Sequence, residues 1–274
     1  MNTDTMETRL RAAFGFKYAP FAKNLELDER FESGRLKKAR EQLAYLASRR
    51  GIGLLASEPG LGKSTLLRGF LGSLSQATHC PVYVPFTNCA TLDVFRQIAQ
   101  GFGLTPPHRK GELMRQIQER LLKLSRAQKL RPVLVIDDAQ LLTSRCLDEL
   151  RLLTSFDMDA RDELTLVLAG HPQLESNLRL AINEALAQRI VLRIQLRGLT
   201  REELEGYLSY RLTRAGRTDQ LFEPDAIEAL WVATHGVPRA VDGLAEQALL
   251  LALAAKAKSI KAELVTQAAE ERPL

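Results

Sequence analysis

Residues 51–68, which read GIGLLASEPGLGKSTLLR, decide the fold of this chain. The apolar run Gly51–Ala56 is typical of a strand that is covered on both faces. A loop containing Gly60 and Gly62 follows this run, and Lys63-Ser64-Thr65 opens a stretch with apolar residues at helical spacing. A strand, a glycine-rich loop and a helix in this order predict a site that holds phosphate groups.

The residues of this loop suit the binding of a nucleoside triphosphate. The two glycines let backbone N–H groups turn toward phosphate oxygens without a Cβ in the way. We expect Lys63 to reach the β- and γ-phosphates and the Ser64 hydroxyl to hold Mg²⁺. Ser57 stands where the usual motif has glycine, at the strand-to-loop turn, a position that makes no phosphate contact. The predicted nucleotide-binding residues of the loop are Ser57, Pro59, Gly60, Leu61, Gly62, Lys63, Ser64 and Thr65.

A second apolar run ends in two acidic residues. Residues 132–136 read PVLVI, and Asp137 and Asp138 follow directly. We expect Asp137 to bind the nucleotide's Mg²⁺ together with Ser64, and Asp138 to polarise the attacking water as the catalytic base. The alternative interpretation is a solvated strand end. The two motifs together predict an ATPase with ATP and Mg²⁺ as cofactors.

Apolar runs alternate with helical patterns over the first two hundred residues. This alternation predicts an α/β fold, a P-loop core with a five-stranded parallel sheet flanked by helices. The last run alternates apolar and polar residues, as an edge strand does. The predicted strands are residues 51–56, 81–86, 132–136, 164–169 and 191–196, and the predicted helices are 64–76, 92–102 and 111–128.

The pattern changes to helices alone after Gly198. Thr200 and Glu203 form a capping box, and Pro224 and Pro238 each open a further helix. A fourth helix is predicted over residues 260–269. We therefore predict a core with an N-terminal extension over residues 1–198 and a small all-helical lid over residues 199–274.

The charge, the cysteines and the lengths of the apolar stretches limit the classes of protein to which the chain can belong. The net charge of +5 and the pI of about 9.2 suit an anionic partner, nucleic acid first. The three cysteines are widely spaced and suggest neither a disulfide framework nor a zinc site. The N-terminus lacks the features of a signal peptide, and no apolar stretch reaches the roughly 20 residues that span a bilayer. We expect a cytoplasmic protein without a membrane span.

Taken together, the segments resemble one branch of the AAA+ ATPases. This branch contains the ExeA/GspA secretion ATPases and the transposition helper ATPases of the TniB, TnsC and MuB kind. The resemblance covers residues ~13–255. The matching segments, in order, are Phe14-Gly15-Phe16 with Pro20-Phe21, the stretch 51–68, VLVIDDAQLL (133–142), AGHPQL (169–174), LAQRI (186–190) and GVPRAV (236–241).

The resemblance implies roles for four more residues. Asp138 stands where the branch usually has glutamate, so hydrolysis is expected to be slow or to need a partner. His171 would be sensor 1, or else a surface histidine in a turn before proline. Arg189 would be the arginine finger that reaches a neighbouring subunit's γ-phosphate, or else a member of a surface ion pair. Arg239 would be sensor 2, and the Phe14–Phe21 stretch would lie near the adenine or pack under the core.

The expected function is that of an ATP-dependent DNA transposition helper. The resemblance implies a homo-oligomeric ring or filament that binds double-stranded DNA and recruits or stimulates a DDE transposase. Arg109, Lys110 and Arg145 are candidate DNA contacts, although solvated helix faces also carry such charges. A secretion-associated ATPase, which the lack of a membrane span disfavours, and a slow nucleotide-switched scaffold are the alternatives.

Overall fold

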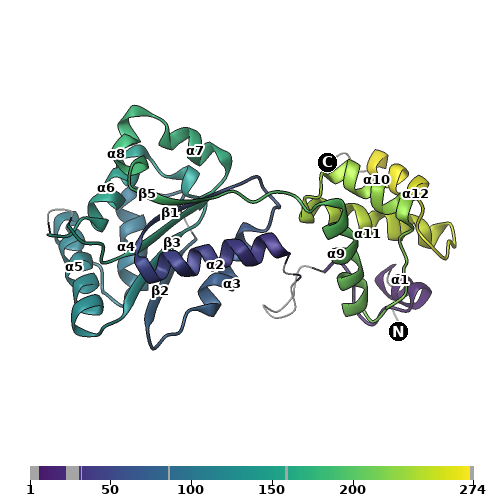
Figure 1. Cartoon of the computed structure of the whole chain (residues 1–274), viewed down its shortest axis with the longest axis horizontal. Coiled ribbons are helices and arrows are strands. Elements are labelled where there is room, and N and C mark those ends of the chain that lie inside the picture. Colours follow the sequence, from purple (N-terminus) through teal and green to yellow (C-terminus); the bar gives the residue numbers. More distant parts are fainter. Residues whose placement is uncertain (1–5, 23–30, 32, 86, 158–159, 272–274) are drawn as a thin grey trace. The chain divides into compact units, whose positions relative to one another are not determined.

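The computed structural model describes residues 6–22, 31, 33–85, 87–157 and 160–271. Within these residues the chain forms two compact units, whose elements are labelled in Figure 1. The α/β unit comprises Gly34–Pro59 and Lys63–Leu196. The helical unit comprises the described parts of Met1–Ser33 and Arg197–Leu274, together with Gly60–Gly62.

Five parallel strands form the sheet of the α/β unit, in the order β2-β3-β4-β1-β5. The predicted fold class and the edge position of the last strand are confirmed. β2 forms the other edge of the sheet, and its Tyr83 is 44% exposed. Phe86, at the end of the predicted second strand, lies outside the described residues. The strands are β1 (Gly51–Ala56), β2 (His79–Val84), β3 (Arg131–Ile136), β4 (Thr165–Gly170) and β5 (Ile190–Ile194).

Helices pack on the sheet and bury its apolar side chains. One continuous core joins Ile52 and Leu54 of β1 with residues of the helices that follow β2 and β3. The helix that precedes β1 contacts four of the five strands. The helices are α2 (Gly34–Arg49), α3 (Lys63–Ser73), α4 (Thr91–Gly101), α5 (Lys110–Leu122), α6 (Ser144–Thr154), α7 (Pro172–Leu178) and α8 (Glu184–Ala187), and a π-helical turn (Lys123–Ala127) extends α5.

A buried carboxylate ties three segments together at the start of β4. Glu163 is 4% exposed and accepts hydrogen bonds from Arg50 (2.6 Å), Arg126 (3.0 Å) and the Ser125 hydroxyl. Burial acts to raise the pKa of Glu163, but the hydrogen bonds and the two guanidinium charges outweigh it and lower the pKa. The π-helical turn supplies Ser125 and Arg126, so it is part of this cluster.

The C-terminal part of the helical unit agrees with the pattern read from the sequence. The Thr200–Glu203 capping box is present at the start of α9, and Pro224 and Pro238 begin the next two helices. Among the described residues, no helix combines the length and the apolar character needed to cross a membrane. The helices of this unit are α1 (Met6–Phe14), α9 (Arg201–Arg214), α10 (Pro224–Thr234), α11 (Pro238–Ala254) and α12 (Ala262–Glu271).

The N-terminal extension packs with the helical unit, whereas the sequence pattern placed it with the core in residues 1–198. Phe14, Phe16 and Phe21 are each 5% exposed and lie in one apolar core with residues of α9–α12. The alternative expected for these aromatics, packing under the α/β core, is therefore wrong. The physical reason is that α1 and the C-terminal helices bury their apolar faces against each other.

A buried polar cluster joins the N-terminal segment to α9 and α11. Arg211 is 5% exposed, donates a hydrogen bond to the Ala22 carbonyl (3.1 Å) and pairs with Asp242 (3.5 Å). Its guanidinium also lies over the rings of Phe21 and Tyr207, 5.7 Å from each centroid. The Tyr207 hydroxyl donates to Asp242 (2.6 Å). Burial raises the pKa of Asp242 despite the opposing effects of Arg211 and Tyr207.

Candidate functional site

The predicted phosphate-binding loop lies between the end of β1 at Ala56 and the start of α3 at Lys63. Gly60 and Gly62 have φ values of 82° and 94°, which only glycine adopts without strain, so both are required by the turn. The buried Lys63 side chain reaches back across the loop, and its ammonium group donates to the carbonyls of Ser57 and Glu58, the latter at 3.0 Å. Lys63 is thus held within the loop that carries the two glycines, and its phosphate-binding role stays a prediction.

The two predicted acidic residues follow β3 directly. Asp137 is 8% exposed, and Asp138 has a left-handed backbone (φ 48°) at the start of a short 3₁₀ turn. The Asp137 Oδ1 accepts the Asp138 N–H (3.0 Å), and the Thr87 hydroxyl donates to the Asp138 carbonyl (2.9 Å). The left-handed backbone of Asp138 is therefore held by hydrogen bonds on both sides, one to Asp137 and one from Thr87.

Gln140 links Asp138 to the end of β4. Its amide Nε2 donates to Asp138 Oδ1 (3.1 Å), and its Oε1 accepts the His171 N–H (3.0 Å). The His171 Nε2 lies 4.0 Å from Asp138 Oδ1, so the structure brings these two predicted residues together. A Cβ on Gly170 would collide with the Gln140 Oε1, which explains glycine at that position. The role of Gln140 was missed from the sequence.

The residues of this site suit ATP with Mg²⁺. Mg²⁺ prefers oxygen ligands and retains several waters, so a hydroxyl and one carboxylate are an adequate protein contribution. Ser64 is the second residue of α3, and the nearly buried Asp137 carboxylate follows β3, which lies in the same sheet as β1. The oxygen donors therefore fit the metal, and Lys63 and the start of α3 supply the positive charge that a triphosphate needs.

Arg189 lies just before β5, where its guanidinium binds the C-terminal end of α6. It donates to the Ser155 hydroxyl (2.8 Å), with the Thr154 hydroxyl and the Arg151 carbonyl at 3.5 Å. Burial and the nearby charge of Arg151 lower the pKa of Arg189. Within this chain the guanidinium therefore caps a helix, and a role in a neighbouring subunit's site stays a prediction.

Arg239 is the second residue of α11 in the helical unit. Its backbone N–H donates to the carbonyl of Gly60, a loop residue assigned to the same unit (3.4 Å). A Cβ on Gly60 would lie 3.0 Å from the Cβ of Arg239, so the glycine also makes room for this contact. The sensor 2 role of the Arg239 side chain stays a prediction.

The structure gathers the three candidate DNA contacts at two helix N-termini. Arg109 and Lys110 cap and start α5, and Arg145 is the second residue of α6. Lys110 and Arg145 both pair with one carboxylate oxygen of Glu149, Arg145 at 3.2 Å. The Arg145 side chain is 79% exposed, so its charge remains available at the surface. Glu149, which brings the two cations together, was missed from the sequence.

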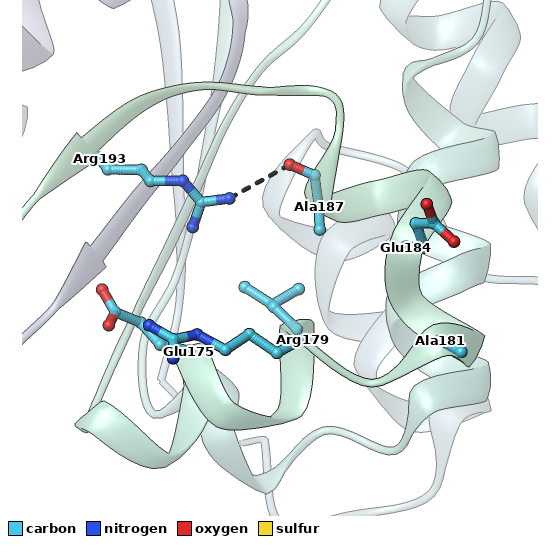
Figure 2. A pocket seen from close by; sticks show the side chains of 7 residues that line it. Glu175, Arg179, Ala181, Glu184, Ala187 and Arg193 are labelled. Carbon is cyan, nitrogen blue, oxygen red and sulfur yellow. Dashed lines mark hydrogen bonds between the residues drawn. The ribbon is translucent and has the colours of Figure 1, made fainter.

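A cavity of about 550 Å³ lies on another part of the α/β unit (Figure 2). The Arg193 guanidinium donates to the Ala187 carbonyl at its rim (3.2 Å). None of the predicted nucleotide or DNA residues lines it. The lining residues are Glu175, Leu178, Arg179, Ala181, Glu184, Ala187 and Arg193, from α7, α8, β5 and the segment between the two helices.

Comparison with protein families matches residues 46–178 to the AAA domain, the segment that contains the loop and the acidic pair. This match, together with the loop and the acidic pair, shows a P-loop ATPase that uses ATP and Mg²⁺.

Among curated proteins, the chain is similar to General secretion pathway protein A of Aeromonas hydrophila. The two are 32% identical over 246 residues, which cover 88% of this chain and 44% of the relative. The chain thus spans less than half of that protein. The AAA domain therefore resembles that of an ExeA/GspA-like ATPase, as the sequence motifs suggested.

Solved structures show where else this AAA fold occurs. Cdc6p from Pyrobaculum aerophilum is 20% identical with a TM-score of 0.65, covering 95% of this chain and 70% of that one. The Aeropyrum pernix ORC1 protein in complex with DNA is 21% identical with a TM-score of 0.62, covering 93% and 69%. The Thermotoga maritima RuvB Holliday junction branch migration motor is 21% identical with a TM-score of 0.58, covering 92% and 73%. These identities establish a shared fold.

Proposed function

We propose that the chain is an ATP-dependent DNA-binding ATPase that acts as a DNA transposition helper. In this role it binds target duplex DNA and recruits or stimulates a DDE transposase. The observation that carries the proposal is the surface formed by Arg109, Lys110 and Arg145 around Glu149, since two helix N-termini add their dipoles to these cations. Phosphates of duplex DNA are the chemistry that such a surface fits.

Two further observations support DNA as the partner. The chain carries a formal net charge of +5, which favours association with a polyanion. The solved ORC1 structure named above is a complex with DNA, and a Drosophila ORC structure of similar fold (17% identity, TM-score 0.66) is also bound to DNA. A protein that uses ATP on DNA would work in the cytoplasm.

Within the ATP site each residue has a proposed role. Lys63 binds the β- and γ-phosphates, while Ser64 and Asp137 hold Mg²⁺. Asp138 polarises the attacking water, and its hydrogen bond with Gln140 and its closeness to His171 connect it to the end of β4. The loop from Ser57 to Thr65 surrounds the phosphates.

We propose that nucleotide binding controls the assembly of the chain into an oligomer. Arg189 would leave the end of α6 and meet the γ-phosphate bound by a neighbouring copy, so ATP would favour a homo-oligomeric ring or filament and hydrolysis would release it. Arg239, on the helical unit, would report the nucleotide state. Asp138 in place of glutamate suits slow turnover, which would prolong the assembled state on DNA.

The test is binding of the purified chain to a random-sequence duplex with ATP, ADP or no nucleotide, at ~50 and ~200 mM salt. We expect ATP-dependent, salt-sensitive binding with growth of large complexes. Lys63→Ala should abolish nucleotide binding and, with it, the ATP dependence. Arg189→Ala should bind ATP normally but fail to assemble, whereas normal assembly of Arg189→Ala would refute the arginine finger.

A secretion-associated role is the second candidate, and the 32% identity to General secretion pathway protein A favours it. The same experiment separates the two. ATP-dependent assembly without DNA binding under any nucleotide would overturn the transposition proposal and support the secretion-type role. Failure of ATP to change either assembly or DNA binding would leave a nucleotide-binding scaffold.

A further inference from the structure

The Asp137 carboxylate receives a hydrogen bond from a residue outside every motif of the sequence. The Tyr83 hydroxyl, on β2, donates to Asp137 Oδ2 at 2.8 Å, across 54 residues of chain. The other oxygen, Oδ1, accepts the Asp138 N–H at 3.0 Å. Both oxygens of the predicted magnesium-binding carboxylate are therefore oriented by the protein itself.

The position of Tyr83 on an edge strand makes this contact unusual. Tyr83 pairs in register with Val135 of β3, two residues before Asp137, and its side chain is 44% exposed. An exposed tyrosine on a sheet edge can direct its hydroxyl to solvent, yet this hydroxyl lies against a carboxylate that is 8% exposed. The contact joins the edge strand to the end of the neighbouring strand, where the ATP site lies.

The remaining acceptor capacity of Asp137 suits a hydrated metal ion. A carboxylate has about four lone-pair positions, and the two hydrogen bonds to Asp137 use two of them. One further position on each oxygen is left for water molecules that Mg²⁺ retains or for the ion itself. Partners that orient a metal-binding carboxylate in this way typically contribute 10–100-fold to metal affinity.

We infer that Tyr83 is a positioning residue for Mg²⁺, because its hydroxyl fixes the orientation of the Asp137 carboxylate. The inference rests on the proposed Mg²⁺ role of Asp137. The Tyr83 hydroxyl donates its proton to Asp137 Oδ2, so the carboxylate is held by a contact from a neighbouring strand. Tyr83 touches neither nucleotide nor reacting atoms in this role and acts through Asp137.

Tyr83→Phe removes the hydroxyl and keeps the ring. The measurement is the affinity for the fluorescent nucleotide mant-ADP in EDTA, followed by a Mg²⁺ titration at fixed nucleotide. We expect the Mg²⁺ midpoint to rise about tenfold, while the affinity in EDTA stays within about twofold of the original chain. Tyr45→Phe, at a tyrosine on α2 that is 65% exposed, is the matched control and should change neither value.

Each other outcome overturns a defined part of the inference. An unchanged Mg²⁺ midpoint in Tyr83→Phe would refute the positioning role and leave the Mg²⁺ site intact. A parallel loss of affinity in EDTA would show that Tyr83 supports the fold of the loop and not the metal. Absence of any Mg²⁺ effect in the original chain would refute the proposed metal site itself.

Discussion

The α/β unit and the helical unit each place a largely buried carboxylate beside arginine, but the pKa values of the two carboxylates shift in opposite directions. Glu163 in the α/β unit accepts from Ser125, Arg50 and Arg126, and its pKa is lowered. Asp242 in the helical unit has the Tyr207 hydroxyl and one longer ion pair, and its pKa is raised.

The difference shows that donors set against burial decide the direction in which the pKa of a carboxylate moves. Burial alone raises the pKa of both groups, because it disfavours the charged form. Three donors overcome this effect at Glu163. At Asp242 a hydroxyl and a guanidinium at 3.5 Å do not, and the charge of Glu246 raises the pKa further. Asp242 therefore has less to offset its burial than Glu163 has.

Arg211→Ala should have the largest effect, because it removes the cation that faces Asp242 and the donor to the Ala22 carbonyl. Loss of one partner of a buried ion pair costs about 3 kcal/mol. Urea unfolding followed by circular dichroism would measure this loss. Arg201→Ala, which removes a half-exposed ion pair on the same helix, should cost under ~1 kcal/mol. Equal penalties for both variants would contradict the dependence on Arg211.

Glu163→Gln should destabilise the α/β unit by about 2 kcal/mol at neutral pH, because it weakens hydrogen bonds from charged groups. The lowered pKa fixes the sign of the pH dependence. The contribution of Glu163 is fully present above its ordinary pKa of 4.5 and is lost as the pH falls through the lowered folded value. The difference in the free energy of unfolding between Glu163→Gln and the original chain should therefore become smaller on acidification.

Urea unfolding at several pH values between neutral and acid would test this dependence. The neighbouring exposed Asp162 provides the control, and Asp162→Asn should show almost no penalty at any pH. A penalty for Glu163→Gln that stays constant down to strongly acid pH would mean that the side chain's shape matters and its charge does not.

Tyr207→Phe should have the smallest effect, about 1 kcal/mol, because it removes one hydrogen bond to Asp242. The way this loss of stability changes with pH can be compared with that of Glu163→Gln. Since the folded pKa of Asp242 is raised, the carboxylate becomes protonated on acidification before it would in the unfolded chain, and the hydroxyl then has less charge to stabilise. The penalty should be larger at neutral pH than near pH 4, and Tyr210→Phe on the same helix serves as control.

Motifs made of consecutive residues were predictable because neighbouring residues determine their backbone conformation. The loop from Ser57 to Thr65 and the capping box at Thr200 each depend on local backbone geometry, and the alternating apolar runs set the sheet. The contacts of Tyr83 with Asp137 and of Lys110 with Glu149 join residues that are 54 and 39 positions apart. No local pattern specifies such pairs, so they could be found only once the strands and helices were placed.

The packing of the N-terminal aromatics could not be predicted for a related reason. Phe14, Phe16 and Phe21 have no periodic pattern that selects one apolar surface over another, and both units offer such surfaces. The partners come from the other end of the chain: the C-terminal helices supply the apolar surface, and Arg211 and Arg217 donate to the carbonyls of Ala22 and Phe14.

The union of both chain ends in one unit has a consequence for synthesis on the ribosome. Phe14 and its partner Arg217 are separated by 203 residues. At ~5–20 residues per second, the aromatic segment waits roughly 10–40 s before the helices that cover it emerge. During this interval the three phenylalanine side chains are not yet covered by the helices that bury them in the folded unit. We therefore expect the nascent segment to be bound by chaperones that recognise exposed apolar sequence.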